Sequence, residues 1–200
     1  FIRDARAVEP LCQALGDRAR MVRNYVAWAL GEIGDERALG PLLAALERSS
    51  LREPVIASLG KIGNANILHP FITGLADPLR IVREVSTEAL VSIFRKSSAQ
   101  ERQHISSEVR RGAVARAVSF LEELLETSGG MLQRSAVAGL GWIGKPETVP
   151  KLLSLLHEED ISESVVHALR STGQAAVPVL LDRLADSNVL VRRVAALVLG

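Results

Sequence analysis

Six residues near the middle of the chain, Gly139-Leu140-Gly141-Trp142-Ile143-Gly144, match the G-x-G-x-x-G pattern that cradles a dinucleotide pyrophosphate. Acidic residues (158–160) follow about twenty residues later, where a ribose-binding carboxylate would lie. Such a loop needs a strand before it and a helix N-terminus after it, because the free N–H groups of that helix bind the phosphate. The meaning of the match therefore depends on the elements around it.

The histidines and the one cysteine are the other residues that could bind metal or act as nucleophiles. His69, His104 and His167 have no Cys, His or carboxylate partner at ligand spacing, and the single His-Glu pair is His157-Glu158. One such pair cannot hold two metal ions. Cys12 has apolar neighbours, which favours a packed side chain over a nucleophile. The sequence thus predicts no catalytic residue, no metal site and no cofactor.

The composition is that of a globular chain built on aliphatic side chains. Of its 200 residues 48% are hydrophobic, but only 4% are aromatic. A net charge of +1 gives no electrostatic reason to expect nucleic acid or an acidic membrane surface as a partner. No apolar run reaches the roughly 18 to 20 residues that a membrane helix needs. We expect a cytoplasmic protein without an internal disulfide.

One short signal recurs along the chain in constant phase. It reads AWALGEIG at 27–34, ASLGKIG at 57–63 and AGLGWIG at 138–144, with weaker copies at 88–94, 167–173 and 196–200. The leucines that the copies share are Leu30, Leu59, Leu90, Leu140, Leu169 and Leu199. Successive leucines are separated by 29, 31, 50, 29 and 30 residues. A unit of about 30 residues therefore repeats, with one insertion of about 20.

Each unit has two apolar-periodic segments separated by a short polar break. Apolar residues at helical spacing, such as Val22, Val26, Ala29 and Ile33, predict helices rather than strands. The glycines then follow the second helix, where carbonyls point outward and the helix dipole is negative. We interpret Gly141 and Gly144, which recur as the pairs 31/34 and 60/63, as helix-end signals. The pyrophosphate interpretation is rejected.

The predicted fold is all-α, a solenoid of about six helix pairs in a single domain. The expected units are 4–34, 35–63, 64–94, 112–144, 145–173 and 174–200, with an insertion at 95–111. The first residues align with the tail of a preceding unit, and the last unit stops short of its expected end. We therefore expect the chain to be part of a longer protein.

These residues resemble the short HEAT-like repeats first described in phycobilin lyase subunits. The resemblance rests on Asp35–Leu46, on Val22-Arg23 and on Ala29–Gly34, with their counterparts in other units. It implies helix pairs stacked into a right-handed superhelix, with the second helices on the concave face. It also implies a bend in the first helix of most units, at Pro10, Pro41, Pro70, Pro150 and Pro178.

The same resemblance implies a structural ladder of Asp and Arg residues along the stack. The aspartate lies in the turn and the arginine begins the second helix, six residues later. The pairs are Asp17 with Arg23, Asp77 with Arg83, and Asp186 with Arg192.

Enzymes built on related repeats provide two tests. A di-iron hydroxylase of the deoxyhypusine type carries His-Glu pairs at the start of several second helices, and the matching positions here contain no His. A HEAT-like DNA glycosylase needs a basic concave groove with aromatic residues. The corresponding row is mixed and slightly acidic, and it consists of Asn24, Glu53, Glu84, Arg134, Glu163 and Arg193.

Both tryptophans occupy concave-face positions that are polar or small in most other units. A large aromatic on a polar ridge is a candidate anchor for a partner; alternatively, Trp28 or Trp142 covers a neighbouring unit or the insertion. The candidate partner-binding residues are Trp28, Asn24, Glu84, Glu88, Arg134, Trp142, His167 and Arg193.

The insertion begins with a plausible capping box, Ser98-x-x-Glu101. Ile105, Val109 and Ala113 then continue at helical spacing, so the insertion either extends the next first helix or adds a short one. Its basic excess fits either a solvated face or a docking surface.

Together these features predict a non-catalytic scaffold that binds another protein or peptide on its concave surface, within a bacterial or archaeal protein. The alternative is a bilin-lyase-type subunit that assists chromophore attachment to, or removal from, phycobiliproteins.

Overall fold

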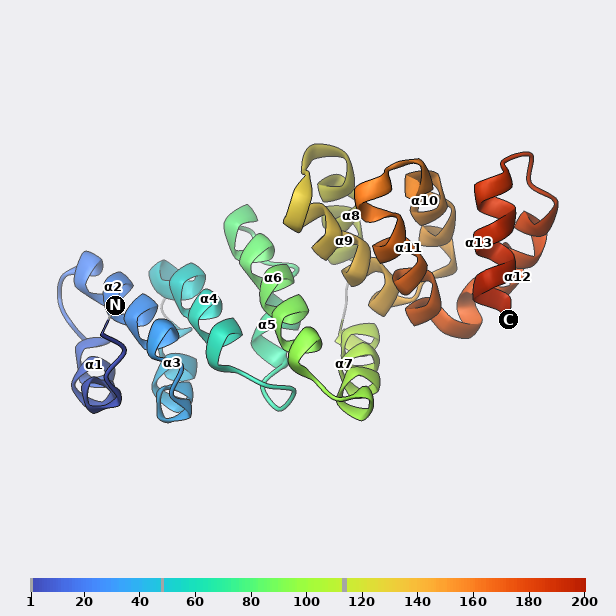
Figure 1. The fold of residues 1–200 in the computed structure, drawn as a ribbon. Helices are drawn as coiled ribbons and strands as arrows, with labels where there is room; N and C mark the ends of the chain where they lie inside the picture. Colours follow the sequence, from blue (N-terminus) through green and yellow to red (C-terminus); the bar gives the residue numbers. More distant parts are fainter. Residues whose placement is uncertain (1, 48, 113–114) are drawn as a thin grey trace. The chain divides into compact units, whose positions relative to one another are not determined.

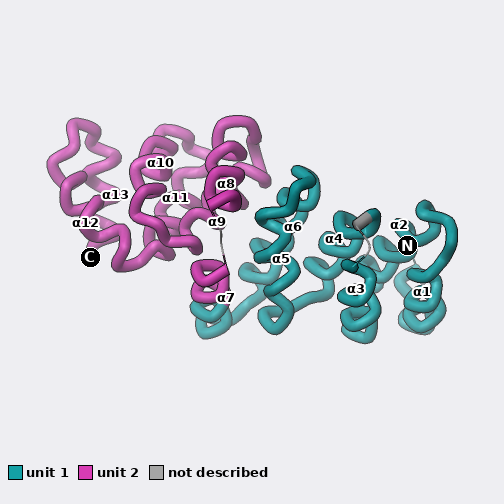
Figure 2. The backbone as a smooth tube through the Cα atoms, turned by 180° about the vertical axis from the view of Figure 1, so that it is seen from behind, with its two compact units in different colours: residues 1–104 teal, residues 105–200 magenta. Residues whose placement is uncertain are grey.

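The computed structural model describes residues 2–47, 49–112 and 115–200. The described residues form α-helices and short 3₁₀ helices (η), with no strand among them. This confirms the all-α solenoid of repeated helix pairs. The chain divides into two compact units, residues 1–104 and 105–200 (Figure 2).

Three helix pairs make up the first compact unit (Figure 1). The pairs are α1 (Val8–Ala14) with α2 (Arg20–Ile33), α3 (Leu39–Ala45) with α4 (Arg52–Ile62), and α5 (His69–Gly74) with α6 (Arg80–Lys96). Three 3₁₀ helices connect them: η1 (Ala5–Ala7), η2 (Glu36–Ala38) and η3 (Ser49–Leu51). The second helices also stack on one another, α2 on α4 and α4 on α6.

The second compact unit continues the same plan. Its pairs are α8 (Ala115–Thr127) with α9 (Gly130–Ile143), α10 (Val149–Ser154) with α11 (Glu159–Thr172), and α12 (Val177–Asp182) with α13 (Val189–Leu199). The short helices are η4 (Pro146–Thr148), η5 (Leu155–His157), η6 (Gly173–Ala176) and η7 (Arg183–Ala185). Here α9 packs closely on α11.

The core of each compact unit is aliphatic and follows the repeat. Of the leucines that define the repeat, Leu30, Leu59, Leu90, Leu140 and Leu169 are fully buried between the helices. Burying one leucine side chain contributes about 1.5–3 kcal/mol, so the constant phase of these residues is the main source of the repeated architecture.

The prolines lie in the first turns of their helices rather than in the middle of them. Each of the five is the second or third residue of a short α-helix, as Pro10 is in α1 and Pro150 is in α10. N–H groups in the first turn have no acceptor within the helix, so a proline there breaks no helical hydrogen bond. In most units a 3₁₀ helix precedes the α-helix that contains the proline.

The glycines of the repeat signal have two different roles. Gly34 and Gly144 cap α2 and α9 in the left-handed conformation, with φ of 78° and 67°, as predicted. Gly63 ends α4 with φ of −70° instead. Gly31 and Gly141, with Gly60, lie inside their helices, so reading them as helix-end signals was wrong. A Cβ on Gly141 would lie 2.6 Å from the Ala168 Cα, so this glycine is the point where α9 touches α11.

The insertion is helical and contributes α7 (Ala99–Gly112), and the residues between α7 and α8 lie outside the described ranges. The predicted capping box closes: the Ser98 N–H donates to Glu101 Oε2 at 2.7 Å, and the Glu101 N–H donates to Ser98 Oγ at 3.4 Å. This hydrogen bonding lowers the pKa of Glu101. Ile105 and Val109 are buried, whereas Ala113 lies outside the described residues. No helix in the described part of the chain has the length and apolarity to cross a membrane.

Candidate functional site

The Asp and Arg residues of the expected ladder hold the turn within each unit. The Nη1 of Arg23 donates to the backbone oxygens of Asp17 at 2.8 Å and Arg18 at 2.9 Å. The Asp17 Oδ1 accepts the Ala19 N–H at 2.7 Å. Arg83 with Asp77 and Arg192 with Asp186 repeat this arrangement. The predicted six-residue spacing therefore corresponds to one turn structure used three times.

The expected ladder consists of Asp–Arg pairs along the stack, and the contacts within the turns are of a different kind. Within each turn the aspartate carboxylate accepts a backbone N–H, and the arginine donates to backbone carbonyl groups. Among the described residues the ladder pair along the stack joins Arg52 to Asp77, with Nη1 and Oδ2 2.9 Å apart. Residue types alone predicted the partners but not which atoms meet.

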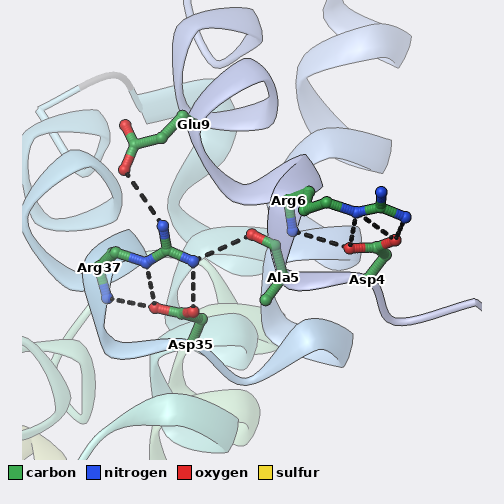
Figure 3. A network of polar contacts seen from close by, with 6 residues as sticks. All are labelled: Asp4, Ala5, Arg6, Glu9, Asp35 and Arg37. Carbon is green, nitrogen blue, oxygen red and sulfur yellow. Dashed lines mark hydrogen bonds and ion pairs between the residues drawn. The ribbon is translucent and has the colours of Figure 1, made fainter.

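A second recurring turn was not predicted. In Asp4-Ala5-Arg6 and Asp35-Glu36-Arg37 the aspartate caps a 3₁₀ helix, and the arginine side chain folds back onto it (Figure 3). Arg37 Nη2 also donates to the Ala5 carbonyl at 3.0 Å, which ties the second helix pair to the first. Hydrogen bonds from the Arg37 side chain and backbone lower the pKa of Asp35 to about 2. The repeated D-x-R-A sequence was the available signal.

Trp28 lines an open pocket of about 580 Å³ in the first compact unit. Its side chain is 38% exposed, and Lys61 Nζ lies 6.0 Å from the ring centroid. Glu32 sits on the rim, where it pairs with both Arg3 and Lys61. These contacts, Lys61 first, lower the pKa of Glu32. The residues that line the pocket are Ile2, Arg3, Asp4, Arg6, Ala7, Trp28, Ala29, Glu32 and Ile33.

Trp142 is not a surface anchor. Its side chain is only 3% exposed, and Arg110 of the insertion helix donates its Nε–H to the Trp142 backbone oxygen at 3.0 Å. The alternative in which this tryptophan is part of the packing beside the insertion therefore holds, and Trp142 is withdrawn as a candidate partner-binding residue. Aligning the repeat units of the chain detected an unusual residue at this position, but it could not show that α7 lies against this end of α9.

The other candidate residues fall into both compact units. In the first, Asn24 is half-buried, Glu84 pairs with Arg80 at 2.8 Å, and Glu88 is exposed. In the second, Arg134 is half-buried, and His167 lies 3.8 Å from Glu163.

Arg193 lines a second open pocket, of about 710 Å³, between α11 and α13. Its floor and walls are mainly apolar, and its charged groups come from both helices. We call this pocket the α11–α13 groove. The residues that line it are Leu156, His157, Glu159, Ser162, Glu163, Val166, Leu190, Arg193, Val194 and Leu197. Of the predicted candidates, only Arg193 lies in it.

Cys12 and the histidines offer little chemistry where they lie. Cys12 is half-buried, and burial raises the pKa of its thiol, which disfavours the thiolate. All four histidines are exposed on separate elements. In the described part of the chain no three His, Cys, Asp or Glu side chains are grouped as metal ligands would be.

Comparison with known proteins places this geometry in a family. A family model for HEAT repeats matches residues 1–53, 87–170 and 118–200. The chain belongs to the HEAT-repeat family. This confirms the resemblance drawn from the repeat signal.

Several relatives are similar along most of their length. The chain is 29% identical over 195 residues to the phycocyanobilin lyase subunit alpha of Picosynechococcus sp., covering 89% of this chain and 69% of the relative. The complex of CpcE and CpcF of phycocyanin lyase from Nostoc sp. contains a similar fold (TM-score 0.51, 24% identity, 94% and 74% coverage). A designed armadillo repeat protein is also similar (TM-score 0.58, 17% identity, 96% and 98% coverage).

These comparisons overturn one expectation. The sequence was interpreted as a non-catalytic chain, yet the curated relative is named as a phycocyanobilin lyase subunit, and the Nostoc complex is named as one of phycocyanin lyase. The prediction preferred a non-catalytic scaffold because the sequence has no recognisable catalytic motif, and it kept the bilin-lyase-type subunit only as the alternative.

Proposed function

We propose that this chain is a subunit of a phycobilin lyase, which assists the attachment of a linear tetrapyrrole to a phycobiliprotein or its removal. The observation that carries the proposal is the 29% identity to a phycocyanobilin lyase subunit over 89% of the chain. Its partners would accordingly be proteins: a second lyase subunit and the acceptor phycobiliprotein.

The Trp28 pocket supports this proposal by its chemistry. A linear tetrapyrrole is a flat conjugated molecule with two propionate groups, so it needs an aromatic or apolar surface and nearby cations. Trp28 offers an accessible ring, with Ile33 and Ala29 beside it. Arg3 and Lys61 share the single carboxylate of Glu32, which leaves an excess positive charge at the rim. We assign Trp28 to stacking on the tetrapyrrole and Arg3 to pairing with a propionate.

The test mixes the purified chain with phycocyanobilin, alone and with a complementary lyase subunit and the apo-phycobiliprotein. We expect a change in the visible absorbance of the tetrapyrrole on binding, and faster formation of the covalent adduct, measured by the mass of the denatured phycobiliprotein. If the absorbance stays unchanged and adduct formation is no faster at every ratio of subunits, the proposal is contradicted.

Two variants of α2 test the assignment of the pocket. Trp28→Ala should weaken tetrapyrrole binding about tenfold, because stacking on one aromatic side chain contributes roughly 1–3 kcal/mol. Tyr25→Ala is the matched control: Tyr25 is an exposed aromatic on the same helix but does not line the pocket. Equal losses in both variants would mean that tetrapyrrole binding does not depend on this pocket.

A further inference from the structure

Neighbouring second helices make contact through small residues in three places. Gly31 of α2 faces Ser58 of α4, and Gly60 of α4 faces Ala89 of α6. In the second compact unit, Gly141 of α9 faces the backbone of α11 at Ala168. A Cβ on any of these glycines would lie 2.5–2.9 Å from the facing residue. These helices are therefore as close as their backbones allow, because glycine has no side chain that would keep them apart.

The contact between α11 and α13 lacks both small residues. Counting from the repeat leucine, Arg170 occupies the position of Gly141, and Val198 occupies the position of Ala168. Side chains of this size cannot fit in the space that the glycine contact leaves. Consistent with this, α11 and α13 contact each other far less than α9 and α11 do. The α11–α13 groove lies between these two less closely packed helices, although neither Arg170 nor Val198 is among the residues that line it.

The groove exposes apolar side chains that are unusual for a protein surface. Leu190 and Leu197 of α13 are 37% and 52% exposed, and both line it together with Val166 of α11. An apolar channel between two helices has the shape that receives the apolar face of a third helix.

Charge distinguishes among possible helices. On the α11 side, Glu159 and Glu163 line the groove one helical turn apart, and Glu163 is almost fully exposed. On the α13 side the charged residue is Arg193. Two carboxylates against one guanidinium favour an occupant with basic residues flanking its apolar face.

We propose that the α11–α13 groove binds an amphipathic α-helix of a partner protein, with aliphatic residues facing Leu190 and Leu197 and Lys or Arg beside Glu159 and Glu163. No residue of the Trp28 pocket takes part. The proposal therefore concerns a protein partner and stands apart from tetrapyrrole binding.

The test uses two synthetic helical peptides with the same leucine face, flanked in one by lysines and in the other by glutamates. Their binding to the 200-residue chain is measured by fluorescence anisotropy. We expect the lysine peptide to bind at least about tenfold more tightly, with a difference that shrinks as salt is raised. The preference should reverse in the double variant Glu159→Lys, Glu163→Lys. Equal binding of the two peptides, or binding of neither, would overturn the proposal.

Two further variants test the place of binding. Leu197→Asp puts a charge in the groove and should reduce binding of the lysine peptide at least about tenfold, despite adding an acid. Leu181→Asp is the control, because Leu181 of α12 is equally exposed at 53% but lies outside the groove. The double variant Arg170→Gly, Val198→Ala restores the small residues and should abolish binding by closing the groove. Unchanged binding in Leu197→Asp, or an equal loss in Leu181→Asp, would refute the assignment.

Discussion

The contacts of α11 with its two neighbours, α9 and α13, differ although they follow the same repeat. Towards α9, Gly141 allows backbone contact at Ala168, and Arg110 of α7 bonds to carbonyl groups at the C-terminal ends of both helices. Towards α13, Arg170 and Val198 stand at the equivalent positions, and an open groove separates the helices. One helix thus has a closed contact on one side and an open one on the other.

The difference shows how a repeat protein makes a binding surface without changing its fold. The repeat leucines Leu140 and Leu169 are fully buried on the α9 side of α11, and Val191, Val194 and Ala195 of α13 are buried on the other side. Where second helices touch, the contact is made by two small residues: a glycine just after the repeat leucine of one helix and a serine or alanine just before the repeat leucine of the next. We infer that replacing both small residues, as at Arg170 and Val198, lets neighbouring second helices separate while each unit still buries its own core.

The largest effect on stability is expected from adding a single carbon atom, the alanine Cβ, to the contact between α9 and α11. In Gly141→Ala the new Cβ would lie 2.6 Å from the Cα and the backbone oxygen of Ala168, and neither can move as a flexible side chain could. Helix propensity alone would favour alanine by about 1 kcal/mol. We expect strain to outweigh this and lower the free energy of unfolding by about 1–3 kcal/mol, measured by urea denaturation.

Gly40→Ala is the matched control. Gly40 lies in α3, and a Cβ there would have no neighbour within 4 Å. This variant should be neutral or more stable by up to about 1 kcal/mol. If both alanine variants gained stability, the contact between α9 and α11 would not be limited by the glycine.

A smaller effect is expected from removing the bridge between the ends of α9 and α11. The guanidinium of Arg110 donates to the Trp142 oxygen at 3.0 Å and also to the Ser171 oxygen. It interacts favourably there with the negative ends of two helices. Arg110→Ala should therefore lower the free energy of unfolding by about 1 kcal/mol.

Arg111→Ala controls for the loss of one positive charge from α7. Arg111 is exposed and pairs with Glu108 on its own helix, so its removal should cost less than about 0.5 kcal/mol. Urea midpoints that fall equally in the two variants would show that Arg110 contributes only its charge and does not join the helix ends.

Hydrogen exchange compares the two sides of α11 without mutation. Amides in the middle of α9 are held by the glycine contact and by the Arg110 bridge, whereas α13 has neither. We expect amides around Val194 in α13 to exchange at least about tenfold faster than those around Val137 in α9, after correction for intrinsic rates. Equal protection would mean that the groove costs α13 no local stability.

Much of this fold could be predicted from the sequence, because the phase of the buried leucines is visible in one dimension. The capping roles of Gly34 and Gly144 and the Ser98–Glu101 capping box were also predictable, since each depends on residues close in the chain. Gly141 was misread because a glycine that ends a helix and one that lets two helices touch look alike in a sequence.

The candidate site was harder to predict because it depends on contacts between units. Trp28 and Trp142 occupy similarly unusual positions, yet one is accessible and the other is buried next to a helix more than thirty residues away in the chain. The α11–α13 groove did leave a signal, the replacement of glycine by Arg170. Its meaning appears only once the glycine contacts elsewhere are known.

The smallest expected effect concerns the turns that lead into α9 and α13. Asp186 precedes α13, and hydrogen bonds from the Asn188 N–H and from Arg183 lower its pKa. A lowered pKa in the folded state means that the ionised carboxylate stabilises the fold at neutral pH. This stabilisation is lost as the pH falls from the usual range of Asp, near 3.9, through the lower folded value. The turn before α9, Ser128-Gly129-Gly130, has no titratable side chain.

Asp186→Asn keeps the acceptor for the Asn188 N–H but removes the charge, so it should melt slightly below the wild type at pH 7. The difference should disappear in acid, as followed by thermal melts between pH 7 and pH 2.5. A difference that persisted unchanged in acid would show that the charge of Asp186 does not hold this turn, and that the α13 side is no more sensitive to pH than the α9 side.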